Sequence, residues 1–197
     1  MDWVLLELRD ASTPALVIAR RAAFIREDGA ITDLDGISEV TFRNIVNGNY
    51  HLVIRHRNHL GIRTSTIRTL NSTMGFAVPA TYDFSSSQAQ AYQDGAIATN
   101  EAMKDLGSGV FGMWGGNGNS NTSVRASGAL SINDYLFLLT TTLGGNVTTI
   151  ISNVYNNADT NLDGNVRASG APSLNDYLSL ITTVLGGDVT KIINQHL

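Results

Sequence analysis

The residues best suited to chemistry form a short loop rich in aspartate and asparagine. The loop reads Asp159-Thr160-Asn161-Leu162-Asp163-Gly164-Asn165, which matches the opening D-x-[DN]-x-[DN]-G of a calcium loop. In such a loop, oxygen atoms at positions 1, 3 and 5 converge on one cation, and glycine at position 6 permits a sharp turn. We therefore predict a Ca²⁺ site with side-chain ligands from Asp159, Asn161 and Asp163 and a main-chain carbonyl ligand from Asn165.

The fifth predicted ligand lies outside the usual twelve-residue loop. Position 12, where a carboxylate closes the calcium shell, is Gly170, and the next acidic residue is Asp176. Because Asp176 would lie in the first turn of a predicted helix, that helix would hold its carboxylate in one orientation. We predict that Asp176 completes the site after an insertion. The alternative is that these aspartates and asparagines only form turns.

A weaker version of the same loop precedes it. Asn117, Asn119 and Asn121 stand where the second loop has its three side-chain ligands, and Ser123 stands where it has Asn165. Asp134 occupies the place of Asp176. It brings the only formal charge to the first predicted site, whereas the second predicted site has three carboxylates. Calcium affinity rises with the charge of the ligands, so we expect the second site to fill first.

The two loops belong to a tandem repeat. Segment 115–153 matches segment 157–195, and more than half of the aligned residues are identical. In each copy, leucines and isoleucines three and four residues apart follow the loop and end at a Gly-Gly pair, which is typical of a helix and its C-terminus. The repeat predicts two long helices, Ile132–Leu143 and Leu174–Leu185, and two short ones packed on them, Val147–Tyr155 and Val189–Gln195.

The beginning of the chain has the pattern of short strands. Apolar or alternating runs recur between turn residues such as Asp28-Gly29 and Asn47-Gly48-Asn49, and these turn residues tolerate the positive φ of tight hairpins. About seven strands without a convincing helix favour an antiparallel sandwich. The predicted strands are Trp3–Arg9, Ala15–Ile25, Ala30–Leu34, Glu39–Arg43, Tyr50–Arg57, Ile62–Leu70 and Phe76–Phe84.

Charge divides the chain into two parts. Residues 1–84 carry nine arginines and nine acidic residues, whereas residues 85–197 carry four basic and eight acidic residues, which accounts for the whole net charge of −4. Such a shift usually marks a domain boundary. We expect domains at 1–84 and 113–197, joined by a linker, 85–112, with a short helix near Asn100–Leu106.

Composition excludes several classes of protein. The chain has no cysteine, which excludes disulfides, thiolate metal sites and cysteine nucleophiles. The net negative charge gives no support to nucleic-acid binding, and no apolar run approaches the roughly 18 residues of a membrane-spanning helix. Met1-Asp2-Trp3-Val4 lacks a basic stretch before an apolar one, so we expect no signal peptide in this chain.

Motifs that would indicate an enzyme are weak. Gly107-Ser108-Gly109-Val110-Phe111-Gly112 matches G-x-G-x-x-G, but a dinucleotide site needs a long helix after it, and the first asparagine loop follows instead. His56 and His59 could hold a metal, but on an extended segment they would point to opposite faces. A surface turn with hydrogen-bonded histidines is the better interpretation. We expect no enzymatic activity.

The repeat resembles the duplicated module of type I dockerins, on the strength of the D-x-[DN]-x-[DN]-G loop and the helix ending in Leu-Gly. Trp3–Asp10 and Val53–Gly61 resemble a β module near the C-terminus of large secreted bacterial surface proteins. These resemblances imply an α+β chain of two domains, an antiparallel β-sandwich followed by an all-α dockerin-like module. They also imply an extracellular or cell-surface location. The insertion Ala168–Leu174 displaces the surface with which dockerins bind cohesin, so cohesin binding is not carried over.

Two non-enzymatic functions remain open. In the first, the chain is a calcium-binding assembly or anchoring module whose partner is another protein, most simply itself. Residues 135–157 contain no charged residue, and Trp3–Arg9 could be an open edge strand that pairs with a neighbour, so we expect self-association, head-to-tail into a filament if the contact does not close. In the second, the sandwich binds carbohydrate and the calcium unit stabilises it.

Overall fold

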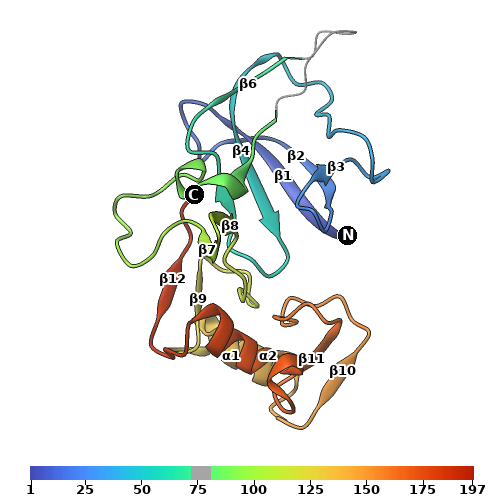
Figure 1. Ribbon diagram of the computed structural model, residues 1–197, viewed down its shortest axis with the longest axis vertical. Helices are drawn as coiled ribbons and strands as arrows, with labels where there is room; N and C mark the ends of the chain where they lie inside the picture. The colour runs from blue at the N-terminus through green and yellow to red at the C-terminus, as the bar shows by residue number, and fades with distance from the viewer. Residues whose placement is uncertain (72–80) are drawn as a thin grey trace.

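The computed structural model describes residues 1–71 and 81–197, and its main element is one antiparallel sheet. The strand order is β3-β2-β1-β4-β5, and β6 pairs with a further stretch of β4. This sheet, with the segments that cover it up to residue 112, is called here the sheet half, and it lies above the rest of the chain in Figure 1. Its strands are β1 (Asp2–Asp10), β2 (Val17–Ile25), β3 (Ile31–Thr32), β4 (Gly48–His56), β5 (Ile62–Arg63) and β6 (Arg68–Leu70).

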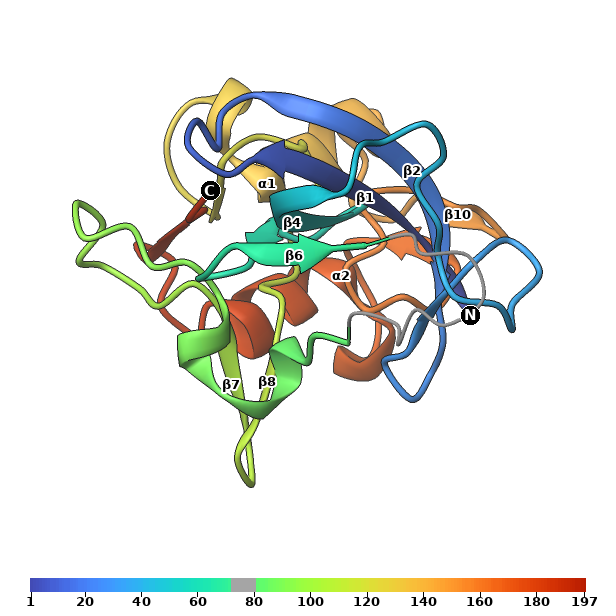
Figure 2. The same ribbon diagram turned by 90° about the horizontal axis from the view of Figure 1, so that it is seen from above.

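Alternation along the strands separates a core face from a charged face. Val4 and Leu6 of β1 and Ile54 of β4 are buried in one cluster with Met103, which comes from the segment that covers this face. That segment contains two short 3₁₀ turns and a hairpin, which projects from the body in the view from above (Figure 2). They are η1 (Phe84–Ser86), η2 (Gln88–Gln90), β7 (Lys104–Gly107) and β8 (Val110–Gly112).

Glu7 organises the opposite face of the sheet. Its buried carboxylate accepts hydrogen bonds from Arg9 and Arg20 and lies 3.4 Å from Arg55 Nε. Burial alone would raise the pKa of Glu7, but the hydrogen bonds from Arg9 and Arg20 and the charge of Arg55 together lower it below its usual value. One carboxylate thus holds three arginines of this face, from β1, β2 and β4, in place.

The predicted β-sandwich is wrong, because no second sheet packs on this one in the described part of the chain. The core face is covered instead by the irregular segment containing η1, η2 and the β7–β8 hairpin. β1 lies between β2 and β4, so it is a central strand and not the predicted open edge. Glu39–Arg43 forms no strand, and most of the predicted strand Phe76–Phe84 lies outside the described residues.

The predicted helix near Asn100–Leu106 is also wrong. Lys104–Gly107 is strand β7, which pairs with β8. Gly107, Ser108 and Gly109 all have positive φ, of 89°, 55° and 76°, so the chain turns back sharply there, and the run that resembles G-x-G-x-x-G is a hairpin turn. No helix follows it directly, whereas the dinucleotide-binding motif opens a helix.

Residues 113–197, called here the repeat half, form two similar units that exchange strands. β9 of the first copy pairs with β12 of the second, and β10 of the first pairs with β11 of the second. Each two-stranded sheet thus contains one strand from each copy. The elements are β9 (Ser123–Arg125), η3 (Leu130–Ile132), α1 (Asp134–Leu136), η4 (Phe137–Thr142) and β10 (Ile150–Ser152), then β11 (Asn165–Arg167), η5 (Pro172–Leu174), α2 (Asp176–Leu178), η6 (Ser179–Val184) and β12 (Ile192–Asn194).

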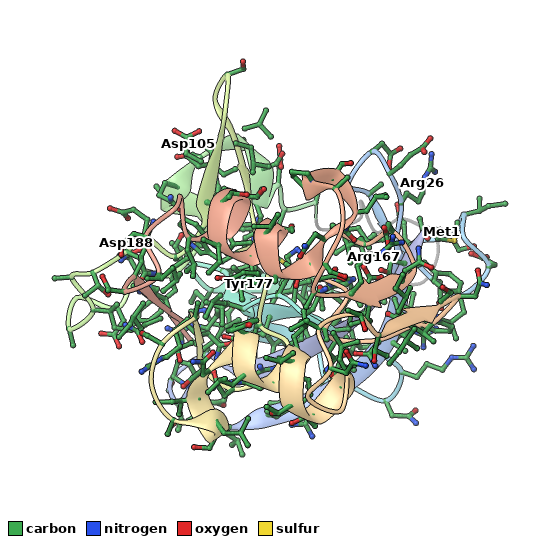
Figure 3. All side chains as sticks on the ribbon, turned by 90° about the horizontal axis from the view of Figure 1, so that it is seen from below. Met1, Arg26, Asp105, Arg167, Tyr177 and Asp188 are labelled. Carbon is green, nitrogen blue, oxygen red and sulfur yellow. The ribbon has the colours of Figure 1, made fainter. Side chains whose placement is uncertain are left out.

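The two helical segments lie side by side, with Tyr177 between them (Figure 3). The rings of Tyr135 and Tyr177, which are equivalent residues in the repeat, have their centroids 4.2 Å apart. In each copy the α-helical turn continues directly into a π-helical segment, η4 or η6, and positive φ at the Gly-Gly pair ends it. This equivalence indicates an approximate twofold relation between the copies.

The predicted all-α module, and with it the two-domain α+β fold, is wrong. Strands account for 30% of the structure and helix for 16%. Ile150–Ser152 and Ile192–Asn194, which lie in the predicted short helices, are strands β10 and β12. Both contain a pair of β-branched isoleucines, which suit strands, and each finds its pairing partner in the loop of the other copy. No helix in the described part of the chain is long and apolar enough to cross a lipid bilayer.

Candidate calcium site

The second loop is curled by hydrogen bonds from its own main chain. Asp159 Oδ1 accepts from the Asp163 amide (3.1 Å) and Asp159 Oδ2 from the Gly164 amide (3.1 Å). Asn161 Oδ1 also accepts from the Asp163 amide, and Asp163 Oδ1 accepts from the Asn165 amide. Gly164 has a φ of +82°, which glycine adopts without strain. These bonds fix the side-chain oxygens at positions 1, 3 and 5 on the inner side of one turn of chain.

Asp176 reaches the same loop from the start of α2. Its Oδ1 accepts from the amides of Thr160 (2.7 Å) and Asn161 (3.3 Å), and its Oδ2 accepts from the Arg167 amide (2.9 Å). The helix begins after its N-cap Asn175, whose side chain accepts from the Leu178 amide. The helix start places Asp176 against both ends of the loop, across the insertion predicted from the sequence.

Asp159 and Asp176 are buried carboxylates that lie close enough for the charge of one to affect the other. Both have an exposed fraction of 0%. The pKa of Asp176 is raised to about 6. Burial is the main cause, the charge of Asp159 adds to it, and the main-chain hydrogen bonds oppose it. Two carboxylates in this position repel each other when ionised, so a cation between or beside them would be favourable.

The first loop has the same framework with fewer charges. Asn121 Oδ1 accepts from the Ser123 amide, and Asp134 accepts from the amides of Asn119 and Arg125. Two hydrogen bonds join the side chain of Asn117 to the main chain of Asn121 across this loop. Asn117 Oδ1 accepts from the Asn121 amide, and Asn117 Nδ2 donates to the Asn121 carbonyl. A side-chain amide thus holds the first loop closed, whereas the second has the carboxylate of Asp159 at this position.

The donor set of the second loop fits a hard cation only in part. Asp159, Asn161 and Asp163 offer oxygen atoms, and Asp159 is a buried carboxylate of the kind that calcium would neutralise. Asp176 Oδ1 already accepts two hydrogen bonds and Oδ2 accepts one from the Arg167 amide, which leaves one lone pair of Oδ2 for a cation. Asn165 begins β11, opposite Ser152. No group of three or more His, Cys, Asp or Glu that could hold a metal is found among the described residues.

Two residues from the turn between β4 and β5, which were not predicted as site residues, touch the second loop or the segment just before it. Arg57 Nη1 donates to the Asn156 carbonyl (2.8 Å), and Arg57 Nη2 lies 3.4 Å from Asp159 Oδ2. Asn58 Nδ2 donates to the Asp159 carbonyl (2.6 Å). The signal was the unusual polarity of Arg55–Asn58 at the end of an otherwise apolar strand, but nothing in the sequence indicated which distant loop it meets.

An extended segment would point His56 and His59 to opposite faces, but the two side chains meet in this turn. His56 and His59 share a hydrogen bond between their Nδ1 atoms (2.8 Å), and His56 Nε2 contacts Asp2 Oδ2 (3.0 Å). The hydrogen-bonded turn was predicted, but its side chains are largely buried. Burial, followed by the charges of His56 and Arg57, lowers the pKa of His59 to about 3, so His59 is neutral and structural.

Comparisons with protein-family models, with curated proteins and with solved structures found no match to this chain.

The raised pKa values predict how stability changes with pH when calcium is absent. Burial raises the pKa of Asp134 from 3.8 to about 7 and that of Asp176 from 3.8 to about 6. The folded state therefore keeps these protons to higher pH than the unfolded chain. The stabilisation is complete below about pH 3.8 and is lost as pH rises through 6 and 7, by about 1.4 kcal/mol for each unit of pKa difference.

Urea unfolding in chelator between pH 4 and pH 8 measures this slope. Asp134→Asn and Asp176→Asn should each flatten the decline over that range. Asp188→Asn is the control, because hydrogen bonds from Thr190 lower the pKa of Asp188 and its protonation falls below the range. A slope that is identical in all four proteins would contradict the assignment.

Proposed function

We propose that this chain is a non-enzymatic calcium-binding module of an extracellular or cell-surface protein, in which Ca²⁺ in the second loop stabilises the repeat half and supports association with a protein partner. The observation that carries the proposal is the buried Asp159 carboxylate, whose charge acts on buried Asp176, in a loop whose oxygens are already oriented by main-chain hydrogen bonds. A pre-oriented set of oxygens binds a cation with little further ordering. The extracellular location rests on the sequence resemblance alone.

Calcium should stabilise this protein more than it would a protein with an exposed site. A buried ionised carboxylate is unfavourable without a counter-charge. Among the described residues Asp159 has only Arg57 nearby, at 3.4 Å, and Asp176 has no ion pair, whereas calcium supplies two positive charges. Extracellular calcium is about millimolar. A ligand that binds only the folded state stabilises it by about 2.7 kcal/mol at a hundredfold excess over its dissociation constant.

Removal of calcium is therefore expected to lower the melting temperature. Chelation should shift the thermal transition by several degrees, and Asp159→Ala should remove most of the calcium-dependent shift. Asn117→Ala, the equivalent change in the first loop, is the matched control and should leave most of it intact, because Asn117 carries no charge. Circular dichroism with calcium and with chelator measures this. Identical transitions of the unsubstituted protein in both conditions would reject the proposal.

Self-association is the form of partnership that the surface favours. Strand β10 pairs only with β11 among the described residues, so its other edge carries no strand, and Ile150 on it is 54% exposed. Unpaired main-chain groups next to exposed apolar side chains form a surface to which another strand can add. Large apolar side chains are exposed elsewhere on the repeat half, at Leu130, Val147, Tyr155, Leu162, Leu174 and Val189.

Light scattering in millimolar calcium tests the association. We expect a mass that is a multiple of 21.1 kDa and that falls toward the monomer in Ile150→Lys. Ile37→Lys is the control, because Ile37 is 84% exposed but lies in the sheet half and not on β10. A monomer mass that does not change with calcium would contradict self-assembly.

Carbohydrate binding is the second candidate function. The cleft that supports it lies in the repeat half and not on the sheet. A cleft of about 460 Å³ lies between the first helical segment and the start of the second loop. Tyr155 is 59% exposed there, and its orientation is fixed because Arg57 packs 4.2 Å from its ring centroid and its hydroxyl bonds to Asp2. A fixed aromatic ring beside amides and hydroxyls suits a neutral sugar. The cleft is lined by Phe137, Thr141, Thr142, Ile151, Tyr155, Asn156 and Asn157.

Affinity electrophoresis in gels containing neutral xylan, neutral laminarin or acidic alginate tests this candidate. The protein should be retarded by a neutral polysaccharide, and Tyr155→Ala should abolish the retardation. Tyr155→Phe is the control that keeps the ring and removes the hydrogen bond to Asp2, so it should retain most of the binding. Equal mobility of the unsubstituted protein in all gels would reject the candidate.

A further inference from the structure

The turn between β4 and β5, residues 56–61, lies between the two loops of the repeat half. We propose that this turn is a structural component of the calcium site, with Asn58 as the positioning residue that couples the occupancy of the second loop to the sheet. The proposal rests on the proposed calcium function and extends it, since it assigns part of the site to residues about one hundred positions away in the chain.

Asn58 contacts equivalent places in both loops. Its carbonyl accepts a hydrogen bond from the Asn117 amide (2.9 Å), and its side-chain Nδ2 donates to the Asp159 carbonyl (2.6 Å). Asn117 and Asp159 are each position 1 of their loop. Asn58 has an exposed fraction of 0%, so neither hydrogen bond can be replaced by bulk water. One side chain and one carbonyl of the sheet half thus hold the starting points of both loops.

Arg57 brings the charge that the site lacks in the absence of metal. Its guanidinium lies within 3.4 Å of Asp159 Oδ2 and donates to the Asn156 carbonyl, three residues before the loop begins. No other ion pair of Asp159 is found among the described residues. Arg57 therefore partly neutralises the buried carboxylate and fixes the approach of the chain to position 1.

The rest of the turn is anchored to the repeat half and cannot move independently of it. Leu60 is 1% exposed and packs in the cluster of Val124, Leu180 and Ile193, and its amide donates to the Trp114 carbonyl (2.8 Å). The Gly61 amide donates to Gln195 Oε1 (2.9 Å). A shift of the second loop on binding calcium would reach this turn through Asn58 and Arg57, and the turn continues directly into β4 and β5.

Substitution of a residue that orients the metal ligands without binding the metal typically lowers metal affinity by about ten- to a hundredfold. Asn58→Ala removes the donor to the Asp159 carbonyl and should weaken calcium binding at least about tenfold, measured by isothermal titration calorimetry. Asn100→Ala is the matched control. Asn100 also joins the two halves, through paired hydrogen bonds with the main chain of Asn194, but it does not touch a calcium loop and should leave the affinity within about twofold.

Hydrogen exchange of the unsubstituted protein supplies a second readout that does not depend on the folding of a variant. Calcium should slow exchange in a peptide that covers residues 56–61, at the amides of Leu60 and Gly61. Calcium binding with unchanged exchange in this peptide, or unchanged affinity in Asn58→Ala, would overturn the coupling and leave the calcium function intact. Absence of any calcium heat in the unsubstituted protein would instead overturn the calcium function itself, and the coupling with it.

Discussion

The repeat half depends on one constraint, which is that its buried carboxylates must be satisfied by the protein itself. Asp134 and Asp176 are shielded from water, and each accepts hydrogen bonds from three or more main-chain amides of its own copy. A buried carboxylate without donors would be strongly unfavourable, so the loops wrap around these side chains. The same bonds place the start of each helical segment against its loop. Strands β9 and β11 begin where these loops end.

Much of the local structure of the repeat half could be predicted from the sequence. The position of the loops, the equivalence of the two copies and the helical character of residues 134–142 follow from patterns within about twenty residues. The strands β10 and β12 could not, because the apolar run around Ile150-Ile151 is too short for its period to separate helix from strand. Their pairing partners lie in the other copy, and that pairing decides the outcome.

The sheet half shows the same division. The alternation of β1 and β4 was visible in the sequence, and so was the turn after His56. The absence of a second sheet was not visible, because the segment that covers the core contributes scattered residues such as Ala91, Ala102 and Met103 without a strand pattern. The role of Asn58 was equally hidden, since an asparagine in a turn usually bonds to its own neighbours, whereas this one bonds to loops that are far away in the sequence.

The exchange of strands between the copies has a consequence for how such a chain can be built. A single copy would have a loop strand and a terminal strand without their partners, because β9 pairs with β12 and β10 with β11. It would be complete only on meeting a second copy of itself, with Tyr135 against its own equivalent. The two copies in this chain are therefore arranged like the subunits of a homodimer that have been joined into one polypeptide. The short connection between them replaces a concentration-dependent association with an intramolecular one, and it allows the copies to differ, as the smaller number of acidic residues in the first loop illustrates.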